Sequence, residues 1–507
     1  MKQGTCKECL VEVTEGMEHL SPRGPEERHL QEDFRLSCRC RIVDATGVVR
    51  YHTMRRGTMR IERRAFDLPL HERTAVPDPC VTRDGPRVLL DGVMIARADG
   101  PLHGLALDVG TTTVVVRLLD LETGEVVADS SFENPQRFGG ADVVARIHYD
   151  THHPGKLLQR TLAGYLAHAL TEFRVDPRTI YEVVVAGNSA MRDLFFRLNV
   201  HSIGQSPYRS LTELGRDAGR RAGTALAASA RGLRVPVHPR ARVYGLPIVS
   251  GHVGADAAAC MLAVDLAHEE RLVALMDIGT NTELIVGNRH RILAASCPAG
   301  PAFEGGRIGC GMPGLPGAIE AVRILPDGSV RTSVIGGGPA EGVCGSGLVD
   351  ALAELLRTGR INDLGRFEDG AEEVVLASDL SRRIVLHERD INELAQAKGA
   401  NVAGLRVVFD TFGIRFEDVA VFYVAGGFGR HLDVGSARRI GLIPDLDDAR
   451  ILQVGNAAIE GATIALLSRS RRAELEQLVE RVEHCRLETH PAFFNYFVEG
   501  CQFRPTR

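Results

Sequence analysis

Two segments of this chain repeat each other. A strand-like apolar run ends in Asp108-Val-Gly110-Thr111-Thr112-Thr113, and a later one ends in Asp277-Ile-Gly279-Thr280-Asn281-Thr282. A second apolar run, 114–119 or 284–286, lies beyond each polar sequence, so each copy predicts a strand, a tight turn and another strand. Two such units predict a duplicated α/β fold whose related halves hold one nucleotide between them.

The residue types of this turn suit a phosphate and its metal ion. Glycine lets the backbone approach a ligand closely and adopt positive φ, and successive N–H groups in a tight turn form an anion-binding concavity. Mg²⁺ prefers carboxylates, water and substrate phosphates, so Asp108 and Asp277 are predicted to hold the metal or its water. An ordinary hairpin with a polar turn is the alternative for either copy alone. The predicted phosphate-binding residues are Gly110, Thr111, Thr112, Thr113, Gly279, Thr280, Asn281 and Thr282.

A third segment fits the base or ribose of the same nucleotide. The apolar run 419–425 ends in Gly426-Gly427-Phe428-Gly429, where the absence of side chains would let a flat group lie on the backbone. The segment is not a P-loop, because no Gly-Lys-Ser/Thr follows. It also lacks the glycine spacing and the later acidic residue of a Rossmann fingerprint.

These three motifs, in this order, resemble those of the acetate and sugar kinase/Hsp70/actin superfamily. The resemblance covers roughly 104–465 and implies an actin-like ATPase of two ribonuclease-H-like lobes, about 101–270 and 271–507. It assigns the two turns to phosphates and the Gly-Gly strand end to adenosine. It also implies two connecting helices, which we expect near 186–191 and 344–350.

Size and charge restrict the class of protein further. The length of 507 residues predicts about three domains, and the net charge of −5 gives no reason to expect nucleic acid. No apolar stretch reaches the length of a membrane span, and the first residues carry no apolar signal region. We therefore expect a cytoplasmic protein with no membrane partner.

Four of the eleven cysteines lie in the first forty residues. Cys6 and Cys9 precede a strand-like segment at 10–14, and Cys38 and Cys40 follow later. The arrangement resembles a β-grasp ferredoxin whose 2Fe-2S cluster is held by C-x5-C-x2-C and a distant cysteine, which implies Cys6, Cys9 and Cys38 as ligands. By that spacing the first ligand would fall just before Met1.

Several explanations of the missing ligand stay open. The natural chain could start further upstream, Cys40 could serve as the fourth ligand, or the module could be a remnant without a cluster. A zinc site formed by the four clustered cysteines is a further alternative. We expect this N-terminally truncated module over 1–45, a linker rich in arginine and proline over 46–100, and the ATPase domain over 101–507.

A loop rich in glycine and proline, 297–317, follows the second turn and is expected to border the nucleotide. Glu283, a predicted catalytic residue, and Glu304 could order the attacking water; ordinary solvent-facing carboxylates are the alternative.

The fusion of a ferredoxin-like module to such an ATPase resembles the reductive activators of corrinoid proteins. Motifs at 134–136, 140–142, 298–305 and 425–429 agree with that family. The resemblance implies ATP, Mg²⁺ and a 2Fe-2S cluster as cofactors, with a low-potential electron donor and the corrinoid protein of a methyltransferase system as partners. ATP would help return inactive cob(II)alamin to cob(I)alamin.

Two other functions remain open at this point. One is a small-molecule kinase of the same fold, and the other is a non-redox ATP-dependent remodelling factor. The connector is shorter than in other family members, so a homodimer is possible but not required.

Overall fold

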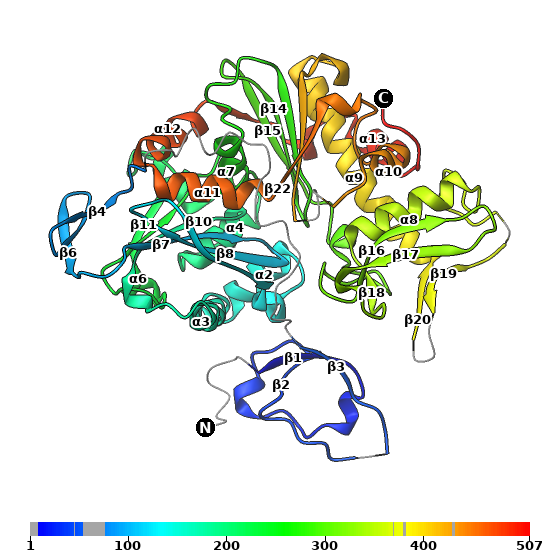
Figure 1. The fold of residues 1–507 in the computed structure, drawn as a ribbon, viewed down its shortest axis with the longest axis horizontal. Helices are drawn as coiled ribbons and strands as arrows, with labels where there is room; N and C mark the ends of the chain where they lie inside the picture. The colour runs from blue at the N-terminus through cyan, green and yellow to red at the C-terminus, as the bar shows by residue number, and fades with distance from the viewer. Residues whose placement is uncertain (1–8, 45, 54–76, 369, 379–381, 428–430) are drawn as a thin grey trace. The chain divides into compact units, whose positions relative to one another are not determined.

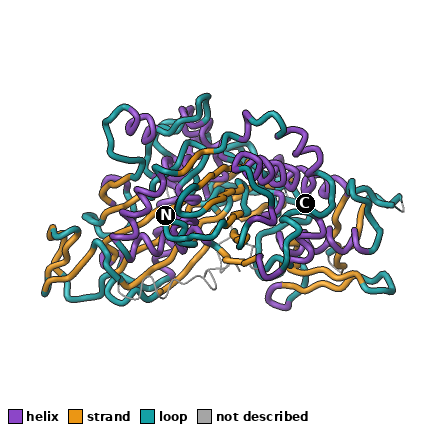
Figure 2. The backbone as a smooth tube through the Cα atoms, turned by 90° about the horizontal axis from the view of Figure 1, so that it is seen from above, coloured by secondary structure: helices purple, strands orange, loops and turns teal. Residues whose placement is uncertain are grey.

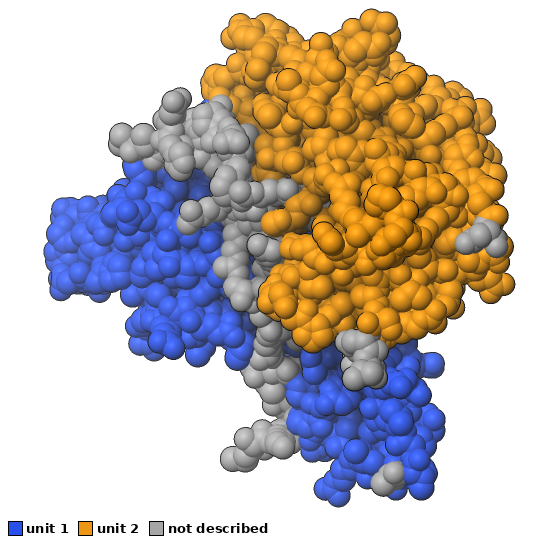
Figure 3. All heavy atoms as spheres, turned by 45° about the vertical axis from the view of Figure 1, so that its right-hand side comes forward, with its two compact units in different colours: residues 1–57, 70–259, 461–479 blue, residues 58–69, 260–460, 480–507 orange. Residues whose placement is uncertain are grey.

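The computed structural model describes residues 9–44, 46–53, 77–368, 370–378, 382–427 and 431–507. They form two compact units, coloured separately in Figure 3. The first unit comprises the described residues within 1–57, 70–259 and 461–479, and the second comprises those within 260–460 and 480–507. The chain therefore returns to the first unit near its C-terminal end.

The first unit is built on a six-stranded sheet (Figure 1). Its strands, in spatial order, are β11 (Leu226–Ser229), β12 (Arg242–Gly245), β10 (Ile180–Ala186), β7 (His103–Val109), β8 (Thr113–Asp120) and β9 (Val126–Glu133). Strands β7, β8 and β9 pair antiparallel, whereas β10 and β12 add in parallel on the other side of β7.

The second unit repeats this arrangement. Its strands, in spatial order, are β22 (Ile451–Gly455), β21 (Val421–Ala425), β13 (Val273–Asp277), β14 (Thr282–Gly287), β15 (Ile292–Cys297) and β23 (Val482–His484). Again three strands pair antiparallel, and two add in parallel beside the first. Five strands thus match in order and direction, which confirms the predicted duplicated α/β fold.

Burial explains the character of the central strands. Strand β10 is buried along its whole length, as expected for a parallel strand covered on both faces. Two large apolar clusters surround the sheets. One is formed by residues of the first unit, including Leu107 and Val185, and the other by residues of the second, including Met276 and Val424.

The described chain combines helices with strands, as Figure 2 shows by colour. The α-helices are α2 (Val143–His152), α3 (Leu157–Glu172), α4 (Ser189–Phe195), α5 (Leu211–Asp217), α6 (Ala230–Leu233), α7 (Ala255–Ala263), α8 (Gly345–Arg357), α9 (Glu388–Phe412), α10 (Val434–Ile440), α11 (Ala457–Leu467), α12 (Arg469–Val479) and α13 (Phe493–Gly500).

The prediction of the connecting helices is wrong. Helices α4 and α8, which begin within the expected segments, each lie in a single unit, whereas the boundary between the units falls inside α7 and α11. Helices α7 and α11 have small residues where they contact each other. A Cβ added to Gly461 would lie 1.9 Å from the carbonyl oxygen of Ala259, so the two helices approach too closely for a larger side chain.

Two small sheets precede the first large one in sequence. Strands β2 (Phe34–Leu36), β1 (Leu10–Glu15) and β3 (Arg50–Thr53) form one sheet, which extends past the expected module boundary at 45. Strands β4 (Val81–Asp84), β5 (Arg87–Leu90) and β6 (Val93–Arg97) form the other, so the segment expected as a linker contains folded structure.

The second unit carries two further small sheets. One contains β17 (Val330–Val334), β16 (Ala318–Ile324) and β18 (Gly342–Val343), and the other pairs β19 (Glu373–Ser378) with β20 (Arg383–His387). Among the described residues, no helix has the length and apolar character needed to cross a membrane.

Candidate nucleotide and cysteine sites

The first turn connects β7 to β8. Asp108 is the penultimate residue of β7 and lies beside Ala186, the last residue of the parallel strand β10. A Cβ on Gly110 would lie only 2.6 Å from the carbonyl oxygen of Thr113, so the tight turn excludes any other residue there. Neither Gly110 nor Gly279 adopts positive φ. Space requires glycine at Gly110, whereas a Cβ on Gly279 would lie 3.2 Å from the carbonyl oxygen of Asn281, which is tight but not prohibitive.

Two asparagine side chains brace this first turn. Asn134 is fully buried, and its Nδ2 donates to the carbonyl oxygen of Gly110 at 2.7 Å. The backbone N–H of Asn134 donates to the carbonyl oxygen of Thr112, also at 2.7 Å. Asn188 donates from Nδ2 to Thr111 Oγ1 at 3.1 Å, and its own Oδ1 caps α4 by accepting from the N–H of Met191. Neutral amides therefore fix the turn from two sides.

The second turn connects β13 to β14 with a different register. Asp277 lies directly opposite Glu283 in the antiparallel pair, whereas Asp108 lies opposite Val115. Cys260, on α7, donates from Sγ to Asp277 Oδ2 at 3.3 Å. The carboxylates of Asp277 and Glu283 thus lie side by side on one face of the sheet.

A second glutamate reaches this turn from the Gly/Pro-rich loop. Thr280 Oγ1 donates a short hydrogen bond to Glu304 Oε2, and the carbonyl oxygen of Thr280 accepts from the N–H of Gly300. Glu283 Oε1 accepts from Ser296 Oγ at 3.1 Å. Burial, and then the charge of Glu283, raises the pKa of the Cys297 thiol to about 12. The second turn is therefore surrounded by carboxylates.

The predicted adenosine segment begins beside the second turn. The N–H of Ile278 donates to the carbonyl oxygen of Ala425 at 3.1 Å. Gly426 has φ +114°, and a Cβ there would lie 2.3 Å from the carbonyl oxygen of Ile278, so only glycine fits. Gly427 follows in a turn; Phe428 and Gly429 lie outside the described residues. Two of the three motifs therefore meet within one unit.

The front module brings two of its cysteines together. Cys9 Sγ and Cys38 Sγ lie 3.0 Å apart, and the N–H of Ser37 donates to the carbonyl oxygen of Cys9 at 2.8 Å. Cys40, two residues after Cys38 in the sequence, is half-buried, and this burial raises the pKa of its thiol. Cys6 lies outside the described residues. Two converging, unbridged thiols are the donor type that an iron–sulfur cluster or zinc requires.

A buried ion pair supports the loop that presents Cys38. Arg35 Nε donates to Glu27 Oε1 at 3.0 Å, and both side chains are almost fully buried. Glu27 Oε1 also accepts from the N–H of Leu36 at 2.8 Å, and the carbonyl oxygen of Leu36 accepts from the N–H groups of Arg39 and Cys40. The pair therefore fixes the backbone on either side of the cysteine turn.

A curated relative establishes the family. The corrinoid activation enzyme RamQ of Eubacterium limosum is 30% identical over 443 residues, which cover 82% of this chain and 72% of the relative. This chain belongs to the family of corrinoid-activating enzymes. Family models for the C-terminal ASKHA domain of RACo and for the RACo middle region match residues 271–507 and 103–269.

Two further similarities agree with this corrinoid-activating family. A Methanosarcina barkeri protein, named as a reductase of the Co(II) methylated amine-specific corrinoid protein, is 26% identical over 78% of this chain and 76% of its own length. A solved structure of a reductive activator for a corrinoid, iron-sulfur protein is 28% identical and covers all of this chain and 93% of that one, with a TM-score of 0.76. The resemblance inferred from the motifs is confirmed.

Sequence reasoning missed three neighbours of the turns in this corrinoid-activating chain. Asn134 and Asn188 belong to longer motifs that give them no individual role, and no predicted motif includes Cys260. A polar Asn directly after a buried strand, as in Ala186-Gly187-Asn188, is a signal that could have identified the second amide. No pattern around Cys260 indicates its contact with Asp277, because that contact depends on tertiary packing.

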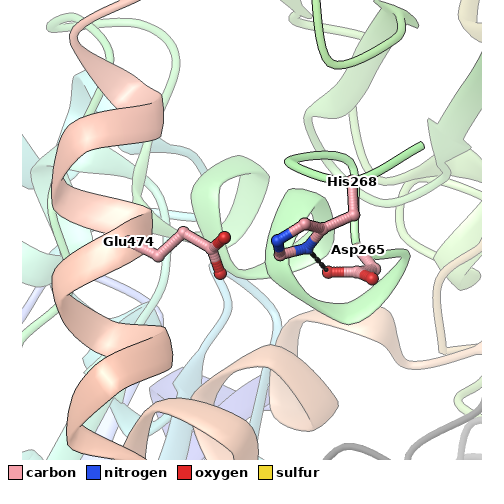
Figure 4. A group of neighbouring side chains, drawn as sticks. All are labelled: Asp265, His268 and Glu474. Atoms are coloured by element: carbon pink, nitrogen blue, oxygen red, sulfur yellow. Dashed lines mark hydrogen bonds and ion pairs between the residues drawn. The ribbon is translucent and has the colours of Figure 1, made fainter. Parts of the chain in front are cut away.

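Another pair of possible metal-binding side chains lies in the segment after α7. His268 and Asp265 hydrogen-bond at 2.9 Å between Nδ1 and Oδ1 (Figure 4). Glu474, drawn in the same figure, belongs to the first unit. The pair offers two ligand atoms, fewer than the three protein ligands of a catalytic zinc site, and we assign no metal centre to it.

Proposed function

We propose that this chain is an ATP-dependent reductive activator that returns the cobalt of a corrinoid protein from cob(II)alamin to cob(I)alamin. The observation that carries the proposal is the combination, in one corrinoid-activating chain, of a converging cysteine pair with two phosphate turns. A kinase of this fold needs the turns but not the cysteines. The cysteines therefore favour electron transfer over transfer of a phosphoryl group to a small molecule.

The turns supply the nucleotide chemistry. Gly110, Thr111, Thr112 and Thr113 offer backbone N–H groups and hydroxyls to phosphate oxygens, as do Gly279, Thr280, Asn281 and Thr282. Asp108 and Asp277 would hold Mg²⁺, directly or through water. Gly426 and Gly427, with Phe428 and Gly429 beyond the described residues, would hold adenosine.

Two glutamates are placed to orient the attacking water. Glu283 lies opposite Asp277 in the strand pair, and Glu304 contacts Thr280. A carboxylate can accept a proton from water only when it lies within hydrogen-bond reach of it. Because Glu304 already contacts the turn through Thr280, it is the stronger candidate for this role, and Glu283 would position the metal-bound water beside Asp277.

The cysteine site fits an iron–sulfur cluster. Cys9 and Cys38 converge, and Cys6 precedes Cys9 at the C-x-x-C spacing of ferredoxins. When bound there, a 2Fe-2S cluster would supply a one-electron relay between a low-potential donor and the corrinoid protein. The Glu27–Arg35 pair would keep the Cys38 turn in place. Cys40 is the candidate for a further ligand.

The remaining assignments rest on this function. We assign the front module to residues from 1 to about 45, with β3 completing its sheet, and the ATPase to 101–507. A corrinoid protein of a methyltransferase system is the proposed partner. A cytoplasmic location and a homodimer stay predictions.

Metal content and turnover test the proposal together. The full chain, purified without oxygen, should contain iron and sulfide in equal amounts, show the absorption and electron paramagnetic resonance of a 2Fe-2S cluster after reduction, and lose them in Cys9→Ser and Cys38→Ser variants. It should reduce a cob(II)alamin protein. An iron-free protein that binds zinc, or one that phosphorylates a sugar or acid instead, would contradict the proposal.

A further inference from the structure

One short segment, 133–138, contacts both the first phosphate turn and the cysteine module. On the nucleotide side, Asn134 binds the carbonyl oxygens of Gly110 and Thr112, and Glu133 pairs with Thr113 across β8 and β9. The segment comprises the end of β9 and the beginning of a short 3-10 helix, Pro135–Gly139. All of these contacts lie within the first unit.

On the module side, the same segment provides a chain of ion pairs. Glu133 Oε2 and His52 Nε2 lie 2.9 Å apart, and Arg137 Nη1 donates to Glu133 Oε1 at 2.9 Å. Arg137 Nη2 then reaches Glu12 Oε2 at 3.2 Å. Glu12 and His52 lie opposite each other in the β1–β3 pair. The segment therefore contacts two neighbouring strands of the module at the same register position.

The central carboxylate of this chain is buried. The Glu133 side chain is only 4% exposed. Burial alone would raise the pKa of Glu133, but His52 and then Arg137 outweigh it and hold the pKa below its ordinary value. The carboxylate therefore stays charged, and charge-assisted hydrogen bonds in such a place are stronger than those at the surface.

Packing also joins the segment to the module. The Phe138 ring meets the His29 ring edge-on at 6.1 Å, and Tyr149 Oη donates to the carbonyl oxygen of His29 at 2.5 Å. Leu10 and Leu36 belong to the same apolar cluster as Phe138. These two leucines directly follow Cys9 and closely precede Cys38, so the packed surface continues into the backbone that presents the cysteines.

One atom of the segment is left unsatisfied. Gln136 is fully buried, and its Nε2 has no hydrogen-bond partner among the described residues.

We propose that segment 133–138 transmits the nucleotide state of the first turn to the cysteine module, with Glu133 and Arg137 as positioning residues. The inference rests on the proposed function, because it presupposes that the turn binds ATP and that the module holds the cluster. A nucleotide can shift the module only through contacts that differ between the bound and free states. Asn134 is the residue that would sense this difference, and Glu133 and Arg137 would convey it.

Hydrogen exchange of the full chain tests this link directly. Exchange would be compared with and without Mg²⁺ and a non-hydrolysable ATP analogue, in the natural sequence and in Arg137→Gln and His52→Gln variants. Neither substitution touches the nucleotide turn. In the natural sequence the nucleotide should slow exchange both at 109–113 and in peptides from 9–53, and by about five-fold or more in the module if the coupling is of ordinary size.

The variants separate transmission from simple anchoring. In both, the nucleotide-dependent change in 9–53 should disappear while protection at 109–113 remains. Arg83→Gln is the matched control, because Arg83 also pairs with a glutamate, Glu122, in the same unit. This control should keep the full nucleotide response.

Three results would overturn the inference. One is nucleotide binding that leaves exchange in 9–53 of the natural sequence unchanged, in which case the proposed function still stands. Another is an undiminished nucleotide response of the module in both variants. A complete lack of nucleotide binding would overturn the inference and the proposed function together.

Discussion

The two proposed phosphate turns share a sequence pattern but not their surroundings. The first, around Gly110, is braced by the amides of Asn134 and Asn188. The second, around Gly279, is surrounded by the carboxylates of Glu283 and Glu304, while a thiol holds Asp277. The duplicated fold thus provides two copies of one backbone feature whose side-chain neighbours differ in charge.

This difference suggests that the two turns have different roles in the reaction. Neutral amides fix a phosphate-binding backbone without competing for the metal, whereas carboxylates attract Mg²⁺ and can order water. The first turn also has a structural connection to the cysteine module, through segment 133–138. We infer that the second turn carries more of the hydrolysis and that the first carries more of the coupling to electron transfer.

The largest expected effect comes from the two carboxylates that we propose to hold Mg²⁺. Asp277→Asn should lower ATP hydrolysis by more than the roughly 100-fold that changes around a metal site cost, and should raise the Mg²⁺ concentration needed for half-maximal rate. Asp108→Asn, the matched change in the other turn, should raise that concentration less. Steady-state hydrolysis over a Mg²⁺ titration gives both values, and an equal rise in the two variants would break the comparison.

The next effect concerns the two glutamates of the second turn. Glu304→Gln should lower kcat by about 100-fold if the carboxylate acts on the attacking water, with ATP affinity nearly unchanged. Glu283→Gln should cost less, because Glu283 is proposed to position the metal-bound water beside Asp277 rather than to act on the attacking water. Single-turnover hydrolysis measures the effect on the chemical step, and equilibrium binding measures the effect on ATP affinity. A loss of affinity without a loss of kcat would instead assign Glu304 to binding.

A smaller effect is expected at the amide brace of the first turn. Asn134→Ala removes the Nδ2 donor to the part-buried carbonyl oxygen of Gly110, a hydrogen bond with a net worth of about 0.5–1.5 kcal/mol. Thermal unfolding should show this loss, and ATP should bind more weakly. Asn134→Asp keeps the size but removes the donor, and it should weaken ATP binding further because it adds a negative charge near the phosphates. An Asp variant that binds ATP as well as the natural sequence would contradict this account.

The smallest effect is expected at Cys260. Cys260→Ser keeps a donor for Asp277 Oδ2 and should preserve the Mg²⁺ dependence. Cys260→Ala removes a weak hydrogen bond, and the lower end of the usual net worth, about 0.5 kcal/mol, corresponds to a change of roughly two-fold. The Mg²⁺ titration used for Asp277 measures both variants. Identical curves for Ser and Ala would show that the thiol packs against Asp277 without positioning it.

The sequence predicts the turns and the fold well, because both depend on local patterns. Glycine after a strand-end aspartate marks a tight turn, and its recurrence predicts the duplicated sheets. What surrounds each turn depends on tertiary packing. The one-residue difference in register that places Glu283 opposite Asp277 is not visible in the aligned motifs. Neither is the contact between Thr280 and Glu304, which the irregular loop supplies.

The connecting helices illustrate the same limit. The resemblance to the superfamily places these helices near 186–191 and 344–350, by their order along the chain. Small residues serve several purposes: Gly187 fits under the carbonyl oxygen of Val109 beside the first turn, whereas Gly461 lets α11 cross α7. Only the packing distinguishes these cases. The folded sheet β4–β6 within the expected linker likewise differs from the prediction.

The central claim is that ATP drives electron transfer to a corrinoid. The most direct measurement follows the appearance of cob(I)alamin absorbance in a corrinoid protein held as cob(II)alamin, with the full chain, a low-potential reductant and Mg²⁺. We predict formation of cob(I)alamin when ATP is present and little without it, with Asp277→Asn behaving as though ATP were absent. Equal rates of reduction with and without ATP would contradict the account.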